Sequence, residues 1–239
     1  FLLTALCFGG SLVLMTAGGQ KIVAGLCYGL CMVLLQLTTP LVNALGIATV
    51  NSGEKMNFGV ARGFGSLGYG VAAYLIGVLT DSKGAGAVPL CMGATLLVLL
   101  LVTLDYKKVK RIPETPKAAA PAQGGFLHRY PRYCLVLVGL VFLFISHVVL
   151  NSFTYQIVVY KGGDSAQMGK AMAFASLLEL PIMFLFGRMQ KMVRCHVWFR
   201  ISGLFFLLKT AGTLLCSTMG GFFAVQLFQM GGWALMTVS

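Results

Sequence analysis

The chain has 239 residues, of which 58% are hydrophobic and only 10% are charged, and its mean hydropathy is +0.87. A soluble domain carries about a quarter charged residues, so this composition excludes an ordinary water-soluble fold and favours a protein whose solvent is a lipid bilayer. The net charge of +12 does not indicate a nucleic-acid-binding protein, because the basic residues lie between apolar runs rather than together on one soluble face.

Charged residues divide the chain into apolar segments, most of which have the ~20 residues that a helix needs to cross ~30 Å of hydrocarbon. The eight segments are Phe1–Ala17, Ile22–Val50, Gly63–Thr80, Gly84–Leu104, Tyr133–Tyr160, Ala171–Gly187, Ile201–Gly220 and Gly221–Ser239. The last two form one run that is too long for a single span, and Gly220–Gly221 is the break expected between them. The sequence therefore predicts an all-α membrane protein with eight transmembrane helices.

A long polar stretch separates the first four segments from the last four. It spans residues 105–132 and contains several prolines, which is typical of a linker rather than a domain. We expect residues 1–104 and residues 133–239 to form two halves of four helices each, joined by this linker.

The basic residues alternate between loops and predict the orientation. One set of loops, which includes the linker, holds thirteen of the eighteen Lys and Arg residues; the opposite set holds four, and Lys209 lies inside a span. By the positive-inside rule, the first set faces the cytoplasm. We therefore expect an integral protein of the plasma (cytoplasmic) membrane, with the linker on the cytoplasmic side.

Three stretches carry a family pattern. Pro-Leu-Val-Asn at residues 40–43 is followed by Asn-Phe-Gly-Val-Ala-Arg-Gly-Phe-Gly-Ser-Leu-Gly-Tyr at residues 57–69. Together they resemble the fourth-to-fifth helix region of the lactose-permease and nucleoside–proton-symporter branch of the major facilitator superfamily. Residues 178–184 resemble the eighth helix of that branch, and residues 226–229 resemble its tenth. The resemblance implies a major-facilitator-type helical bundle.

The same resemblance covers nearly the whole chain, with the eight spans standing for helices three to ten of twelve. The chain begins at Phe1 without a methionine and stops at Ser239 inside an apolar run. We therefore expect it to be a fragment of a longer protein.

The resemblance also implies roles for particular residues. Arg62 matches the arginine that binds substrate hydroxyls in sugar symporters, and Tyr69 matches an aromatic residue that packs against the substrate. An acidic residue expected on the preceding helix is absent, and Asn43 is the nearest polar residue there. The histidine usual on the tenth helix is replaced by Gln229. These departures argue against lactose as the substrate.

Two ionisable residues, Glu179 and Lys209, lie within apolar spans, where a charge costs at least ~2.5 kcal/mol and usually faces a cavity or a partner. Glu179 lies nine residues before Arg188, and Lys209 lies nine residues after Arg200. Both are therefore ~13 Å from the same side of the membrane and near its midplane. The pattern predicts a pair in which Glu179 gains and loses a proton; a static pair that holds two helices together is the alternative.

The other candidates have structural alternatives as well. Arg62 stands at the edge of a span and could be a cytoplasmic anchor, although its planar fork suits bidentate contact with hydroxyls or carboxylates. Asn151 and His147 are four residues apart and share a helix face. They either line a cavity or bond to a neighbouring helix, and the same two alternatives apply to Gln226 and Gln229.

The best interpretation is a secondary active transporter that carries a nucleoside, a sugar or an aromatic acid together with protons, by alternating access between the two halves. The expected site residues are Arg62, Asn43 and Tyr69 from one half, and Asn151, Glu179 and Lys209 from the other. An exporter of hydrophobic compounds and a non-transporting scaffold or receptor are the alternatives. Partners would be the solute, protons and the bilayer, but no nucleic acid, and we expect a monomer.

Enzymatic and metal-dependent functions are not indicated. The sequence has six acidic residues and contains neither a G-x-S-x-G nor an H-E-x-x-H motif. Its seven cysteines include no C-x-x-C pair, so we expect no zinc site and no cofactor.

The predicted orientation can be tested by cysteine labelling. In a cysteine-free background, a single cysteine introduced by Ala118→Cys should resist an impermeant thiol reagent added outside right-side-out vesicles. It should react once the vesicles are opened. Ready labelling from outside would reverse the orientation that the thirteen basic residues predict.

Overall fold

The computed structural model of the chain describes residues 1–16, 20–53, 57–105 and 126–238. Its elements in this part of the chain are helical, and no strand occurs among them. In order they are α1 (Leu2–Thr16), α2 (Lys21–Asn51), α3 (Phe58–Lys83), α4 (Ala87–Asp105), α5 (Phe126–Arg129), α6 (Pro131–Ser152), α7 (Thr154–Tyr160), α8 (Ser165–Met192), α9 (Cys195–Leu215), α10 (Met219–Val225), α11 (Leu227–Gln229), the π-helix η1 (Met230–Ala234) and α12 (Leu235–Val238).

The all-helical membrane fold predicted from the sequence is confirmed. Within the described ranges, α2, α3, α4, α6, α8 and α9 are long and apolar enough to cross a membrane. The first predicted segment forms the shorter apolar helix α1, and the last forms the interrupted run from α10 to α12. Most of the predicted linker, residues 106–125, lies outside the described residues, so the boundaries of the two halves stay a prediction.

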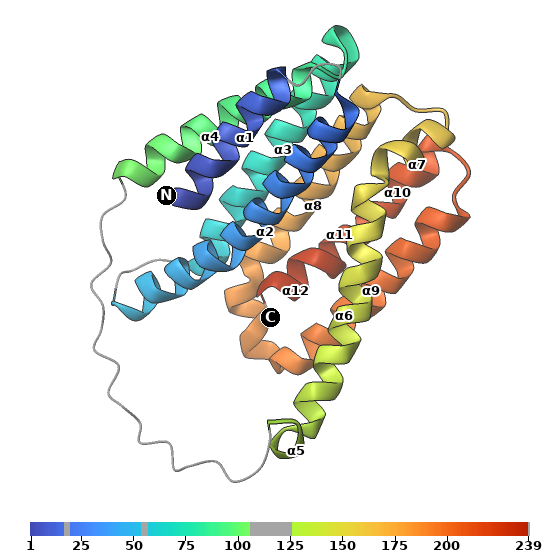
Figure 1. Ribbon diagram of the computed structural model, residues 1–239. Helices are drawn as coiled ribbons and strands as arrows, with labels where there is room; N and C mark the ends of the chain where they lie inside the picture. Colours follow the sequence, from blue (N-terminus) through green and yellow to red (C-terminus); the bar gives the residue numbers. More distant parts are fainter. Residues whose placement is uncertain (17–19, 54–56, 106–125, 239) are drawn as a thin grey trace.

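Successive long helices run in opposite directions along the bundle (Figure 1). Helix α1 packs against α2 and α4, and α3 lies between this group and α8. On the other side of α8, helix α9 packs against α6 and against the run from α10 to α12. The described helix ends that border the loops predicted to be rich in basic residues and those that border the loops predicted to be poor in them therefore lie at opposite ends of the bundle.

Glycines bring α3 and α8 into close contact. Gly63, Gly70 and Gly77 recur at intervals of seven residues on α3 and are buried. A Cβ atom at Gly77 would lie 2.7 Å from the carbonyl oxygen of Ser165 and 2.9 Å from the Cα of Gly169, both near the start of α8. Only a side chain of hydrogen therefore fits at this crossing, as in other membrane helices that pack through small residues.

Side-chain caps set the ends of both helices. The side chain of Asn57 accepts a hydrogen bond from the backbone N–H of Val60 and begins α3, which ends before Gly84 at φ +79°. The carboxylate of Asp164 accepts one from the N–H of Gln167 at 2.7 Å and begins α8. Such caps satisfy N–H groups that a helix leaves free at its start.

The break predicted at Gly220–Gly221 falls a few residues earlier. Helix α9 ends at Leu215, and α10 begins after Thr218, whose hydroxyl accepts a hydrogen bond from the N–H of Gly221. A hydroxyl cap thus determines the start of α10, and the two glycines lie inside this helix. Further along, Ser202 of α9 donates to the carbonyl of Gly232 at 2.9 Å and holds the π-helix η1 in place.

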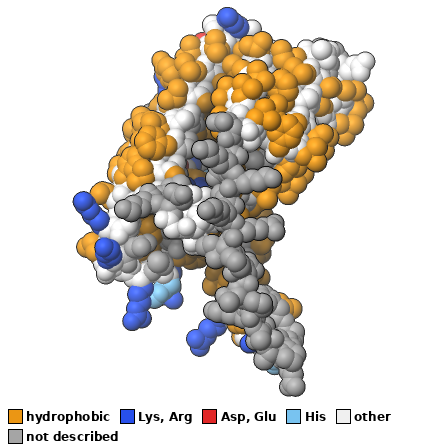
Figure 2. Space-filling view, turned by 90° about the vertical axis from the view of Figure 1, so that its left-hand side faces the viewer, with side chains coloured by type: hydrophobic (Ala, Val, Ile, Leu, Met, Phe, Trp, Pro, Cys, Tyr) orange, Lys and Arg blue, Asp and Glu red, His pale blue; other side chains and the backbone are white. Residues whose placement is uncertain are grey.

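The surface separates apolar from basic side chains, as expected of a membrane protein. In Figure 2, hydrophobic side chains cover much of the body of the molecule, and most of the visible Lys and Arg side chains gather toward its lower end. Helix α6 has no buried residue and α2 has only Cys31, so both present apolar side chains outward. A bilayer can accept such surfaces without cost.

The glycine contact predicts different outcomes for two identical substitutions on α3. Gly77→Ala should lower the free energy of unfolding by about 1–3 kcal/mol, because two backbone atoms of α8 occupy the space of the new methyl group. Gly68→Ala is the control: no atom lies within 4 Å of its Cβ position, and alanine should stabilise the helix by about 0.5–1 kcal/mol. Thermal unfolding of the detergent-solubilised variants measures both. Equal melting temperatures would show that α3 and α8 do not depend on this contact.

Candidate functional site

The carboxylate of Glu179 lies near the middle of α8 and is 5% exposed. One of its oxygens accepts a hydrogen bond from the hydroxyl of Ser66 on α3 at 2.7 Å. Its other oxygen accepts one from the side-chain amide of Gln229 on α11, also at 2.7 Å. The carboxylate therefore joins two elements that are far apart in the sequence, through donors that carry no charge.

Gln229 extends this contact to Lys209. The ammonium group of Lys209 on α9 donates a hydrogen bond to the amide oxygen of Gln229 at 2.6 Å. The predicted proximity of Glu179 and Lys209 is thus present, but the two charges meet through the amide rather than in a direct salt bridge. Ser66, Glu179, Gln229 and Lys209 form one hydrogen-bonded row, which we call the polar row, across α3, α8, α11 and α9.

Three features of the surrounding helices lie next to the polar row: a second hydrogen bond between α3 and α8, a proline inside α8 and the π-helix η1. Ser176, one turn before Glu179, donates from its hydroxyl to the carbonyl of Ser66 at 2.5 Å, so α3 and α8 are joined twice at this level. Pro181 lies inside α8 two residues after Glu179 and removes a backbone hydrogen bond there. Gln229 ends α11, directly before the π-helix η1, a type of turn that is frequent at functional sites.

Arg62 and Asn43 form a second polar contact, between α3 and α2. A terminal guanidinium nitrogen of Arg62 donates to the side-chain oxygen of Asn43 at 2.6 Å. The Nε of Arg62 is buried and has no hydrogen-bond partner among the described residues. The arginine thus has a donor left over for another acceptor.

Asn151 and His147 face the other side of the site, from α6. The amide nitrogen of Asn151 and the Nε2 of His147 are 2.9 Å apart. The imidazole ring stacks on Trp233 of η1, with centroids 4.5 Å apart and ring planes at 10°, and meets the ring of Phe206 edge-on. The shared helix face predicted for Asn151 and His147 is present, and the aromatic rings fix its position.

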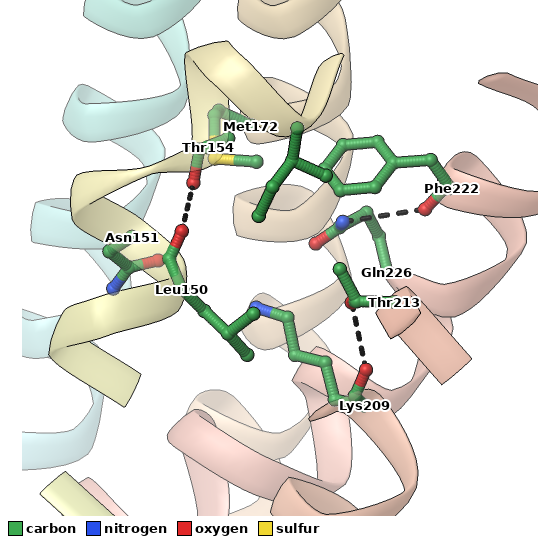
Figure 3. A pocket seen from close by; sticks show the side chains of 9 residues that line it. Leu150, Asn151, Thr154, Met172, Lys209, Thr213, Phe222 and Gln226 are labelled. Carbon is green, nitrogen blue, oxygen red and sulfur yellow. Dashed lines mark hydrogen bonds between the residues drawn. The ribbon is translucent and has the colours of Figure 1, made fainter. Parts of the chain in front are cut away.

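A small pocket lies beside Lys209 (Figure 3). Elements α6 to α10 supply its walls, and Lys209 and the side-chain amide of Gln226 both reach into it. The residues that line it are Leu150, Asn151, Thr154, Ile157, Met172, Lys209, Thr213, Phe222 and Gln226.

The sequence-predicted residues therefore fall into separate groups. Glu179 and Lys209 belong to the polar row, Arg62 contacts Asn43, and Asn151 lines the pocket beside Lys209. Tyr69 makes no hydrogen bond through its side chain to any described residue, and its side chain is 58% exposed on α3.

Sequence reasoning missed the part that Ser66 plays. Ser66 lies four residues after Arg62 and three before Tyr69, so helical spacing alone places it on the face that those residues share. It also missed Trp233, whose contact with His147 joins η1 to α6. No spacing rule predicts that contact, because the π-helix changes the direction of the side chains that follow it.

Comparisons with known proteins give a family but no individual relative. A family model described as "MFS_1 like family" matches residues 1–226. No curated protein matches the chain, and neither does a solved structure. In the described ranges, no group of three or more His, Cys, Asp or Glu residues could hold a metal ion.

The bridging amide yields a stability prediction. Gln229→Met should lower the free energy of unfolding by roughly 1–3 kcal/mol, because a buried carboxylate loses a donor and a buried ammonium loses an acceptor. The same change at the exposed Gln156 of α7 is the control and should cost less than about 0.5 kcal/mol. Melting temperatures in detergent compare the two variants. A loss of equal size in both would mean that the polar row contributes nothing to stability.

Proposed function

Because the chain belongs to the MFS_1 like family, within the major facilitator superfamily, we propose that this membrane transporter carries a small polar solute together with protons by alternating access. Its helices and its family support a transporter. The observation that carries the proposal is the buried carboxylate of Glu179, which meets α3 on one side and α11 on the other.

Glu179 has the environment of a group that exchanges a proton. It is ionisable at the depth of the hydrocarbon, where charged side chains are rare and mark ion and proton pathways. Its hydrogen-bond partners among the described residues are a hydroxyl and an amide, so no counter-ion from that part of the chain binds it directly and its charge is only partly compensated. Gln229 itself cannot titrate. Proton exchange in the polar row is therefore confined to Glu179 and Lys209.

Protonation of Glu179 would change how α3 and α8 are held together. The ionised carboxylate accepts from Ser66 and Gln229, and hydrogen bonds to a charged group contribute about 1.5–3 kcal/mol against about 0.5–1.5 kcal/mol between neutral groups. A neutral carboxyl would hold Ser66 less strongly. Loading of the proton thus weakens a contact between α3 and α8, and this couples the proton to movement of the two halves.

Polar groups on both sides of Glu179 suit a polar solute. On the α2–α3 side, Arg62 offers a guanidinium group and Asn43 an amide. The Nε of Arg62 has no hydrogen-bond partner among the described residues and can donate to a solute. Asn151 and Lys209 offer an amide and an ammonium group on the α6–α9 side. Tyr69, exposed on α3, supplies an aromatic ring. These groups favour a nucleoside, a sugar or an aromatic acid over a purely hydrophobic compound.

The test is proton-driven accumulation in proteoliposomes. Uridine, galactose and benzoate, each radiolabelled, represent the three solute classes, and the one that the wild type accumulates is used further. Glu179→Gln should abolish its uphill accumulation, because an amide cannot bind and release a proton. Equilibrium exchange, which needs no proton movement, should persist.

Asp164→Asn is the matched control. It also replaces a carboxylate by an amide, but at the start of α8, where asparagine caps a helix as well as aspartate does. This variant should accumulate solute normally. If Glu179→Gln accumulates solute normally, Glu179 is not needed for proton coupling. The polar row would then serve only to hold the helices together.

A further inference from the structure

Exposed basic side chains gather where α8 ends and where α6 and α9 begin. These three helix ends lie at the same end of the bundle (Figure 1). We call the group the basic patch, and its members are Arg129, Arg132, Arg188, Lys191, Arg194 and Arg200. The segments that supply them, residues 126–138 and 186–205, contain no acidic residue. The charges of the basic patch are therefore not neutralised within its own segments.

The basic patch consists mainly of arginine. It holds five of the chain's seven arginines, whereas the exposed basic residues described at the opposite end of the bundle are lysines: Lys21, Lys83 and Lys170. The positive-inside rule counts lysine and arginine alike, so orientation in the membrane does not account for this difference. A guanidinium group differs from an ammonium group because it forms two parallel hydrogen bonds with a phosphate or a carboxylate. The composition of the patch therefore favours such an anion.

The basic patch lies at the level of the lipid headgroups. The apolar spans of α8 and α9 are Ser165–Met189 and His196–Leu215. Lys191 and Arg194 lie between these spans, and Arg200 lies only ~6 Å into the second, from where a long basic side chain reaches the interface. The headgroup region adds about 5–8 Å to each face of the hydrocarbon core. The patch and the lipid phosphates thus occupy the same layer.

Aromatic side chains support this depth. The indole N–H of Trp198 on α9 donates to the carbonyl of Met189 on α8 at 3.4 Å, which joins the two helix ends that carry most of the basic patch. Tyr130 and Tyr133 are exposed at the start of α6. Tryptophan and tyrosine are enriched at membrane–water interfaces. The rings therefore place this end of the bundle at the interface independently of its charges.

From its arginine content, its depth and its lack of acidic residues, we infer that the basic patch is a binding surface for the headgroups of anionic phospholipids. The side chains of Arg188, Arg194 and Arg200 make no hydrogen bond or ion pair with any described residue, so their donors are available. A lipid rather than a soluble anion is the expected occupant, because α6 has no buried residue and presents apolar side chains to the bilayer beside the patch. The inference does not depend on the proposed transport function.

Fluorescence quenching in proteoliposomes of the full chain tests the inference. The chain has two tryptophans, so Trp233→Phe leaves Trp198 as the reporter inside the patch. Phosphatidylcholine vesicles receive phosphatidylglycerol brominated near the top of its acyl chains, or equally brominated phosphatidylcholine. Each basic residue near a membrane contributes about fivefold in affinity for anionic lipid. Phosphatidylglycerol should therefore quench at a mole fraction roughly tenfold lower, and ~1 M salt should remove the preference. Equal quenching by the two lipids at low salt overturns the inference.

Removal of three arginines tests whether the patch is the source of the preference. The triple variant Arg188→Gln, Arg194→Gln and Arg200→Gln should reduce the preference to about twofold or less. Lysine at the same three positions keeps the charge and loses the paired donors, so it should lower the preference about threefold. A preference that lysine leaves unchanged would reject arginine–phosphate contacts.

A second triple variant is the matched control. Lys21→Gln, Lys83→Gln and Lys170→Gln remove the same charge from exposed side chains at the opposite end and should keep the preference of the wild type. An equal loss in both triple variants would assign the preference to net charge and reject the patch. Inorganic phosphate added at constant ionic strength should leave the quenching unchanged. If it displaces the lipid, the surface serves soluble anions and the inference fails.

Discussion

The contact between α3 and α8 is the constraint on which the rest of the site depends. Hydrogen-only side chains on α3 let the two backbones approach until an added methyl group at Gly77 would meet the backbone of α8. At that separation the short side chain of Ser66 reaches the carboxylate of Glu179, and Ser176 reaches back to the carbonyl of Ser66. A wider spacing would leave a carboxylate that is 5% exposed without its hydroxyl donor. The cost of burying the charge therefore depends on glycines that never touch it.

Gln229 explains how two opposite charges are kept at the same depth without being paired directly. An amide has one end that accepts and one that donates, so it satisfies the ammonium group of Lys209 and the carboxylate of Glu179 at once. Direct pairing in a medium of low dielectric constant would bind the two charges strongly and discourage either from changing its state. An amide between them keeps each charge hydrogen-bonded and does not lock the two charges together, so a proton can still be gained or lost by one of them. Because an amide does not titrate, Gln229 adds no third titratable group to the polar row.

The long helices and the common depth of Glu179 and Lys209 could be predicted from the sequence. Apolar length and charge spacing predict the long helices, since a bilayer allows few other structures, and counting from Arg188 and Arg200 places Glu179 and Lys209 at a common depth. The bridging role of Gln229 and the donor role of Ser66 could not be obtained that way, because they depend on which faces of α3, α8 and α11 meet. The start of α10 was misplaced by a few residues, since the hydroxyl cap of Thr218 outweighs the nearby glycines.

The π-helix after Gln229 has a consequence for how this segment can vary. A π turn holds one residue more than an α turn, so it accommodates an extra residue without ending the helix. Each residue of an α-helix turns the chain by about 100°, and loss of one residue from this stretch would rotate everything that follows it by that amount. Gln229 would keep its place against α8, whereas Trp233 would leave the ring of His147. Related proteins that lack this extra residue would keep the polar row and lose the stack of Trp233 on His147. Insertion or deletion here would therefore change the α6 side of the site and leave the α8 side unchanged.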